Sequence, residues 1–244
     1  MITMKSRAMA VALAGAALVA TPALSATELT NLERASNKPK VSVNIAGESG
    51  FPTVVRAFGF RMVESVGGVP VPTADEFLAF CIDLLTNLSS PANYDIGVTS
   101  LSGDQQVRVG SFFGANYNQT FVNDVLGGDV VQGAAFQLGL WETVYDDNYD
   151  LTSGDFTGSA VGNNAAQNTA INSLASSFVA AANPLNGASL GIVTYFQANP
   201  ADSTQDLATG GDLSGVVPIP VPAAGVLLLA ALGGLGIAGR RKSA

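Results

Sequence analysis

The sequence predicts an α+β fold in which antiparallel strands form a sandwich or a barrel and carry a few packed helices. Short runs of alternating hydrophobic residues, typical of half-buried strands, come first in the chain. Longer segments with helical spacing follow, and one more strand comes after them. Both ends are apolar, and we expect them to be an N-terminal signal peptide and a C-terminal single-span anchor.

The body is assigned element by element from its hydrophobic spacing. Residues 27–40 are polar, and we expect a loose lead-in there. Strands are expected at residues 40–45, 54–63, 77–84 and 190–196. Helices are expected at residues 104–115, 129–145 and 165–182, the second opening on Asp129 with Gln132 three residues later. Residues 198–217 are polar and rich in glycine, which favours a linker.

Residues 1–26 have the three parts of a secretory signal peptide. Lys5 and Arg7 give a positive start, residues 8–20 are apolar, and small residues surround a cleavage site near Ala26. We therefore expect signal peptidase to remove this segment during export.

Residues 218–244 combine prolines, a short apolar stretch and a basic end. The 17 residues from Ala223 to Gly239 carry no charge and as a helix would span roughly 25 Å, the short end for a bilayer. Arg240, Arg241 and Lys242 follow at once and would hold that end in the cytoplasm, with the body outside the inner membrane.

This tail resembles the PEP-CTERM sorting signals, and within them the VPLPA-CTERM subtype. The matching motif ends in Pro220, Val221, Pro222 and Ala223. The resemblance implies a Gram-negative host in which an exosortase processes the tail, so that the mature protein loses its span. The expected location is then the cell surface or the extracellular matrix, after transient anchoring in the inner membrane.

Composition excludes several classes of function. The chain has 19 acidic and 11 basic residues, and no basic residue lies between Arg108 and Arg240. Nucleic-acid binding needs basic side chains to neutralise phosphate, so we expect no nucleic-acid partner. The absence of histidine excludes the usual Ser-His-Asp and Cys-His catalysis, and the single cysteine excludes an internal disulfide.

Cys81 and Gln137 each stand out from their surroundings. Cys81 is a lone thiol on a hydrophobic strand in a chain expected to enter an oxidising compartment. Gln137 places a polar amide in the middle of an apolar helix, where it is costly without a partner or a chemical purpose. Attack of the Cys81 sulfur on the Gln137 side-chain carbonyl would release ammonia and form an internal thioester. An amine on a partner would then be able to attack that thioester.

The same two segments resemble the bacterial Cys-Gln thioester adhesion domains. The strand reads Phe80-Cys81-Ile82-Asp83-Leu84, and the helix reads Gln137-Leu138-Gly139-Leu140-Trp141, with Phe136 in place of the threonine of the family pattern. The resemblance implies that Cys81 and Gln137 form the thioester and that Asp83 and Trp141 support the motif. It also implies an amine-bearing surface or matrix ligand as partner, with residues 27–197 as the extracellular domain.

Two alternatives remain open. In the first, the protein is a purely structural biofilm or matrix protein in which Cys81 and Gln137 only pack. In the second, less favoured, it is a hydrolase that uses carboxylate pairs such as Asp146 and Asp150. The loop that joins these carboxylates also has the spacing of a calcium loop, but it lacks the turn glycine and the final glutamate. We expect no cofactor, no metal site and no enzymatic turnover.

Overall fold

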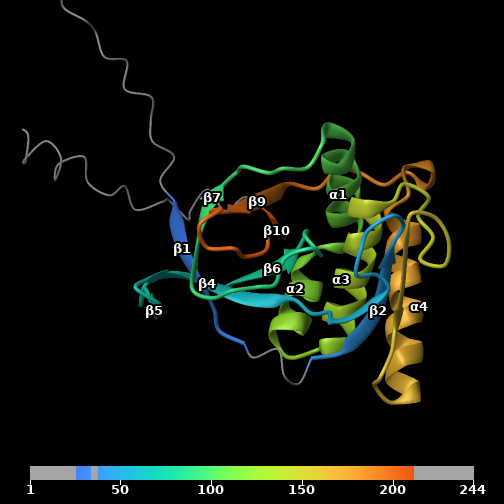
Figure 1. Ribbon diagram of the computed structural model, residues 1–244, viewed down its shortest axis with the longest axis horizontal. Coiled ribbons are helices and arrows are strands. Elements are labelled where there is room, and N and C mark those ends of the chain that lie inside the picture. Colours follow the sequence, from blue (N-terminus) through green and yellow to red (C-terminus); the bar gives the residue numbers. More distant parts are fainter. Residues whose placement is uncertain (1–25, 34–37, 212–244) are drawn as a thin grey trace, which may run out of the picture.

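The computed structural model describes residues 26–33 and 38–211, which form a strand barrel with helices and a smaller sheet packed beside it (Figure 1). The strands are β1 (Thr27–Asn31), β2 (Lys40–Ile45), β3 (Thr53–Arg56), β4 (Phe60–Val66), β5 (Val69–Pro70), β6 (Phe77–Cys81), β7 (Ala92–Ile96), β8 (Phe156–Ala160), β9 (Val193–Ala198) and β10 (Leu207–Gly210). The helices are α1 (Gly103–Asn116), α2 (Gln119–Leu126), α3 (Val130–Tyr145), α4 (Ala165–Ala182) and the short 3-10 helix η2 (Pro184–Asn186).

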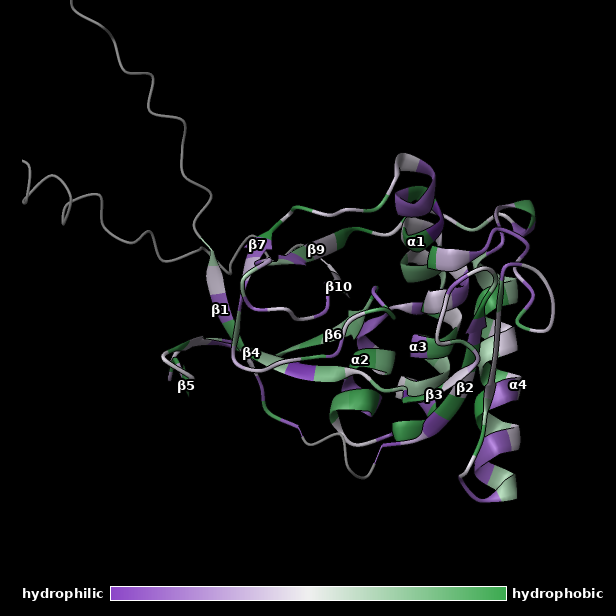
Figure 2. Cartoon of the chain, in the orientation of Figure 1, coloured by the Kyte–Doolittle hydropathy of each residue, from purple (hydrophilic) through white to green (hydrophobic). Residues whose placement is uncertain are grey.

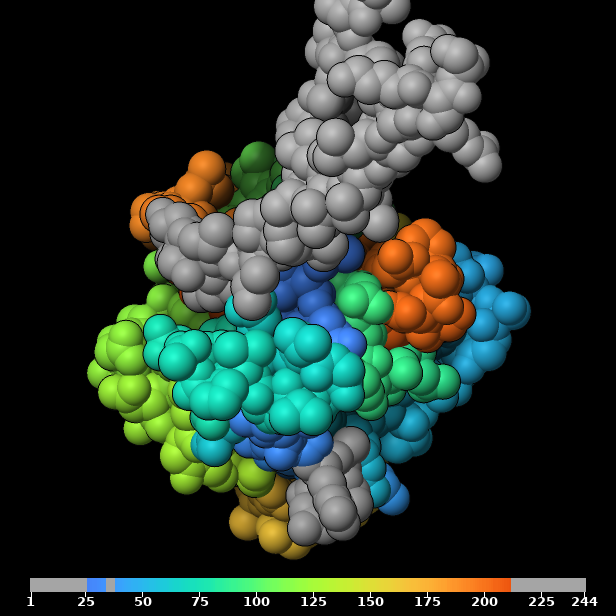
Figure 3. Space-filling model, turned by 90° about the vertical axis from the view of Figure 1, so that its left-hand side faces the viewer, coloured from blue at the N-terminus to red at the C-terminus, as the bar shows by residue number. Residues whose placement is uncertain are grey.

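Six strands close into an antiparallel barrel in the order β1-β7-β9-β10-β6-β4, because β4 pairs back with β1. Closure leaves these strands without the unpaired edges of an open sheet. The β4–β5 hairpin projects from the barrel at the end away from the helices (Figures 1 and 3). The sequence prediction of an α+β fold with antiparallel strands is confirmed, and the sheet is a barrel.

Helix α3 lies at the centre of the molecule, and its residues from Gly133 to Val144 are buried. It packs against α4, α1 and β8, and it contacts β6 of the barrel. The second sheet, in the order β3-β2-β8, lies against the helices (Figure 1). Within the described ranges, no helix combines the length and the hydropathy that a membrane span needs.

Aromatic rings join α3 to the barrel. The ring of Phe136 on α3 lies 4.4 Å from that of Phe80 on β6, and 4.6 and 4.7 Å from those of Phe121 and Phe112. Strand β6 is hydrophobic along its length in Figure 2, and all of its residues are buried. These contacts fix how α3 sits on β6, and therefore where the residues after Phe80 and Phe136 meet.

The prediction of one strand over residues 54–63 is wrong, because this stretch contains parts of two strands that belong to different sheets. Strand β3 belongs to the small sheet and β4 to the barrel, with Ala57, Phe58 and Gly59 between them. A Cβ on Gly59 would lie 2.5 Å from the Leu78 side chain, so glycine permits the close approach at this crossing.

Two stretches expected to be irregular are strands. Residues 27–31 form β1, which completes the barrel in place of a loose lead-in. The expected linker over residues 198–217 is wrong as far as the structure describes it, to residue 211, because β10 pairs there between β9 and β6. The signal peptide, the apolar span, the sorting motif at Pro220, Val221, Pro222 and Ala223, and the basic cluster of Arg240, Arg241 and Lys242 lie outside the described residues.

Candidate functional site

Cys81 is the last residue of β6, and it has a strand partner on one side only, where it lies opposite Leu207 of β10. Ile82 N–H bonds Asp206 O toward β10, so the peptide groups of Cys81 face the opposite side, toward β4. Strand β4 begins at Phe60, which pairs with Ala79, and no β4 residue reaches Cys81. A buried N–H and C=O at this place need another partner.

The Gln137 side chain supplies that partner. Its Oε1 accepts a hydrogen bond from Cys81 N–H at 2.9 Å, and its Nε2 donates to Cys81 O at 2.8 Å. The Gln137 amide thus bonds Cys81 as a peptide group of a longer β4 would. Both the amide and the Cys81 peptide groups are satisfied, so neither carries the cost of an unpaired buried polar group. The structure brings together the two residues that the sequence singled out, and it holds the Gln137 carbonyl against the backbone of Cys81.

Close backbone approaches allow α3 to reach this position. A Cβ on Gly133 would lie 3.3 Å from Gly59 N, and one on Gly139 would lie 2.9 Å from the ring of Phe112. The Asp129 side chain caps the helix by accepting from Val131 N–H and Gln132 N–H, as the sequence predicted. Phe136, which departs from the family pattern, fills the aromatic cluster beside Gln137.

The Cys81 thiol is free and buried, and its Sγ donates a hydrogen bond to Gln205 Oε1. Burial raises the pKa of Cys81 well above its ordinary value, and the carboxylate of Asp83 raises it further. The sulfur is therefore a neutral thiol near neutral pH. Gln205 lies in the segment that the sequence assigned to a linker, and no pattern in that segment marked it.

A cavity of about 460 Å³ opens beside the thiol. Cys81, Gln205, Trp141, Phe58 and Phe60 are among the residues that line it. The indole Nε1 of Trp141 is buried and has no acceptor among the described residues. A buried donor without a partner costs stability, and burial keeps this N–H from the surface of the cavity.

Asp83 and Trp141, predicted to support the motif, both lie near Cys81. Asp83 Oδ1 accepts from Leu85 N–H at 2.7 Å, and its backbone O accepts from Gln205 Nε2 at 2.9 Å. Asp83 therefore shapes the turn after β6. Trp141 follows Gln137 by one helical turn and lines the cavity.

The carboxylates of the loop after α3 are used within the loop itself. Asp146 accepts from the N–H groups of Asp147, Asn148 and Phe156, and Asp150 accepts from Thr152 and Ser153. In the part of the chain that the structure describes, no group of three or more His, Cys, Asp or Glu side chains is placed to hold a metal ion. These bonds explain the acidic loop as a network of turns.

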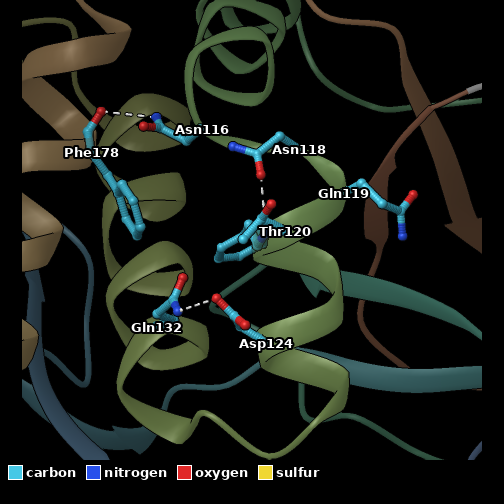
Figure 4. A pocket seen from close by; sticks show the side chains of 8 residues that line it. Asn116, Asn118, Gln119, Thr120, Asp124, Gln132 and Phe178 are labelled. Carbon is cyan, nitrogen blue, oxygen red and sulfur yellow. Dashed lines mark hydrogen bonds between the residues drawn. The ribbon is translucent and has the colours of Figure 1, made fainter.

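A second hollow of about 580 Å³ lies among α1, α2, α3 and α4 (Figure 4). Its polar side chains largely bond their own surroundings. Gln132 donates to Asp124, Asn118 accepts from Phe121 N–H, and Asn116 donates to Phe178 O. Its lining includes the Thr120 hydroxyl and the Asp124 carboxylate but no thiol, and Asp124 is bonded to Gln132, so we place the candidate chemistry at Cys81.

The chain matches no family model and has no match among curated proteins. Two solved structures from Streptococcus pyogenes have a similar course of chain. The N-terminal domain of the pilus tip adhesin Cpa is 14% identical and superposes with a TM-score of 0.36, covering 74% of this chain and 97% of that one. The N-terminal thioester domain of fibronectin-binding protein SfbI is 13% identical with a TM-score of 0.39, covering 73% and 96%.

Proposed function

We propose that this protein is an exported surface or extracellular-matrix protein in which Cys81 and Gln137 form an internal thioester for covalent attachment to an amine. The observation that carries the proposal is the pair of hydrogen bonds between the Gln137 amide and the backbone of Cys81. They hold an electrophilic carbon against the backbone of the residue that carries the one thiol of the chain, which supports an intramolecular reaction.

Thioester formation exchanges one bond for another at Gln137 Cδ. The Cys81 Sγ–Cδ bond forms, the Cδ–Nε2 bond breaks, and ammonia leaves with the thiol proton. Cys81 N–H, 2.9 Å from Oε1, is placed to stabilise the negative charge that develops on this oxygen during attack. Attack by a primary amine then forms an amide at Cδ and returns the proton to the sulfur.

Each molecule reacts once in this scheme, so the protein acts as an adhesin and not as an enzyme. The acceptor is an amine-bearing surface or matrix ligand, and no cofactor takes part. Export uses signal peptidase and an exosortase in a Gram-negative cell. Peptide mapping of the exported protein tests this route, because a retained Met1 or Lys242 contradicts it.

The intact mass of the folded protein tests the thioester. We expect one ammonia less than the sequence mass, and methylamine should add to Gln137 and restore the thiol. Cys81→Ala and Gln137→Ala should each abolish both effects, whereas Gln197→Ala, a half-buried glutamine of β9, should change neither. Full sequence mass in protein that was never heated or reduced would falsify the thioester.

The alternative is that Gln137 only caps the end of β6 in a structural matrix protein. The same two hydrogen bonds favour it, since they satisfy buried peptide groups without any reaction. Gln137→Ala separates the two functions. A cap alone predicts loss of stability with no change in methylamine uptake, because there is none to lose.

A further inference from the structure

Gln205 is the side chain that the Cys81 sulfur contacts. The thiol donates to Gln205 Oε1, and Gln205 Nε2 donates to Asp83 O at 2.9 Å, so both ends of the amide are engaged on β6 and the turn that follows it. The acceptor is a neutral amide oxygen, which orients an S–H bond but is too weak a base to remove its proton.

The neighbours of Gln205 are fixed on either side. Thr204 Oγ1 accepts from Ser89 N–H at 2.7 Å and donates to Ser89 O at 3.2 Å. Asp206 Oδ1 accepts from Ala198 N–H at 2.8 Å, and its backbone O accepts from Ile82 N–H. With Thr204 bonded to the loop between β6 and β7, and Asp206 bonded to β9 and the end of β6, the Gln205 side chain has little freedom to leave the sulfur.

Gln205 also lines the cavity beside Cys81, together with Trp141. The cavity is lined by polar and apolar side chains, among them Asn87, Ser90 and Phe58, so a small polar molecule can enter it. The cavity therefore gives a small amine a route to the side chain that accepts from the thiol.

We propose that Gln205 is a positioning residue for the Cys81–Gln137 reaction. It orients the thiol before the thioester forms, and afterwards it accepts a hydrogen bond from the incoming amine. This rests on the proposed function. When the Sγ–Cδ bond replaces the S–H bond, Gln205 Oε1 loses its donor while Nε2 stays on Asp83 O. The freed oxygen then faces the cavity beside the sulfur and can accept an N–H of the attacking amine. When the C–S bond breaks, the amine's proton returns to sulfur, and the S–H bond to Gln205 forms again.

Two substitutions separate the hydrogen bond from simple bulk. Gln205→Ala removes both, whereas Gln205→Met keeps an unbranched side chain of similar length without the amide. Gln197→Ala serves as the matched control. We expect methylamine uptake by the thioester to slow about fivefold in both Gln205 variants, the effect of losing one neutral hydrogen bond, and to stay unchanged in the control. Equal rates in all three variants would overturn the proposal.

A second measurement does not need the thioester. In a Gln137→Glu background, which cannot release ammonia, iodoacetamide alkylation of Cys81 reports directly on the thiol. Adding Gln205→Ala should speed alkylation about fivefold or more, because the acceptor and the cover over the sulfur are both lost. Adding Gln197→Ala should not change the rate.

The two readouts distinguish the failures. If the parent protein shows full sequence mass, the thioester is wrong, and the alkylation rates alone decide whether Gln205 positions the thiol. If the parent carries the thioester but the Gln205 variants take up methylamine and undergo alkylation at the control rates, Gln205 has no such role. Circular dichroism of each variant confirms that the compared proteins are folded.

Discussion

Glu142 gives this fold a pH dependence that one substitution should remove. Its side chain is 0% exposed on α3, and burial raises its pKa from 4.5 to about 7, with the nearby Asp146 and Asp150 adding to the rise. Asp150 N–H donates to Oε1 at 2.9 Å and opposes the rise, whereas Oε2 has no partner among the described residues.

The direction in which stability changes with pH follows from proton binding to Glu142. Because the folded pKa lies above the unfolded one, the folded state holds more protons between about pH 4.5 and 7, and stability falls as pH rises through this range. A shift from 4.5 to about 7 corresponds to about 3 kcal/mol of stability lost above pH 7. A glutamine side chain at this position would keep an oxygen for Asp150 N–H and carry no charge at any pH.

We therefore expect Glu142→Gln to match the parent near about pH 4 and to exceed it by about 3 kcal/mol near about pH 8. Urea unfolding at each pH measures this difference, and Glu48→Gln, at an exposed site, controls for the loss of one negative charge. Parallel stability curves for Glu142→Gln and the parent across this range would refute the reasoning, since they mean that Glu142 ionises with an unperturbed pKa.

Other substitutions test the packing that places the site. In Gly114→Ala, the new Cβ would lie 2.0 Å from Ser189 O, and we expect a loss of at least about 3 kcal/mol by urea unfolding. In Gly139→Ala, the Cβ would lie 2.9 Å from the Phe112 ring, and we expect a loss of about 1–3 kcal/mol. In Gly103→Ala, on the same helix as Gly114, an added Cβ meets nothing within 4 Å, and unchanged stability is the control. Phe136→Ala should cost about 3–5 kcal/mol and, by loosening α3 on β6, should also lower thioester content measured by intact mass.

The helices with clear end signals were predictable from the sequence. The expected helix over residues 165–182 is α4, and the expected one over 129–145 is α3 with Asp129 as its cap. Local chemistry decides such ends, because a capping side chain bonds backbone groups only three residues away. Helix α2 has the same kind of cap at Asn118, but it is only eight residues long. Its hydrophobic pattern is too short to indicate a helix, so the sequence does not predict it.

The strands that were missed depend on distant partners. Strand β8 reads Phe-Thr-Gly-Ser-Ala and has little β propensity, but its pairing along β2 and its cover by α3 and α4 provide what the sequence lacks. Strands β1 and β10 are short and are the first and last strands of the described chain. They complete the barrel by pairing with β4 and β6, respectively. No local pattern predicts closure, since it is decided by residues far apart in the chain.

The residues of the candidate site likewise fall into those that a local pattern predicts and one that only distant strand pairing brings there. Cys81 and Gln137 were predictable because each breaks its own local pattern, a lone thiol in a hydrophobic strand and an amide in an apolar helix. Gln205 breaks no pattern, since a glutamine in a polar segment is ordinary, and only the pairing of β10 with β6 brings it to the sulfur.

A capping role explains why Gln137 is buried, but it leaves two features unexplained. An amide that only replaces a peptide partner works equally well beside any residue, because it bonds only the backbone of Cys81. Nothing in that role requires the capped residue to be the one thiol of the chain, nor requires a cavity lined by that residue. A stored electrophile needs both a thiol at that place and a route for the amine, and for this reason we favour the thioester over the cap.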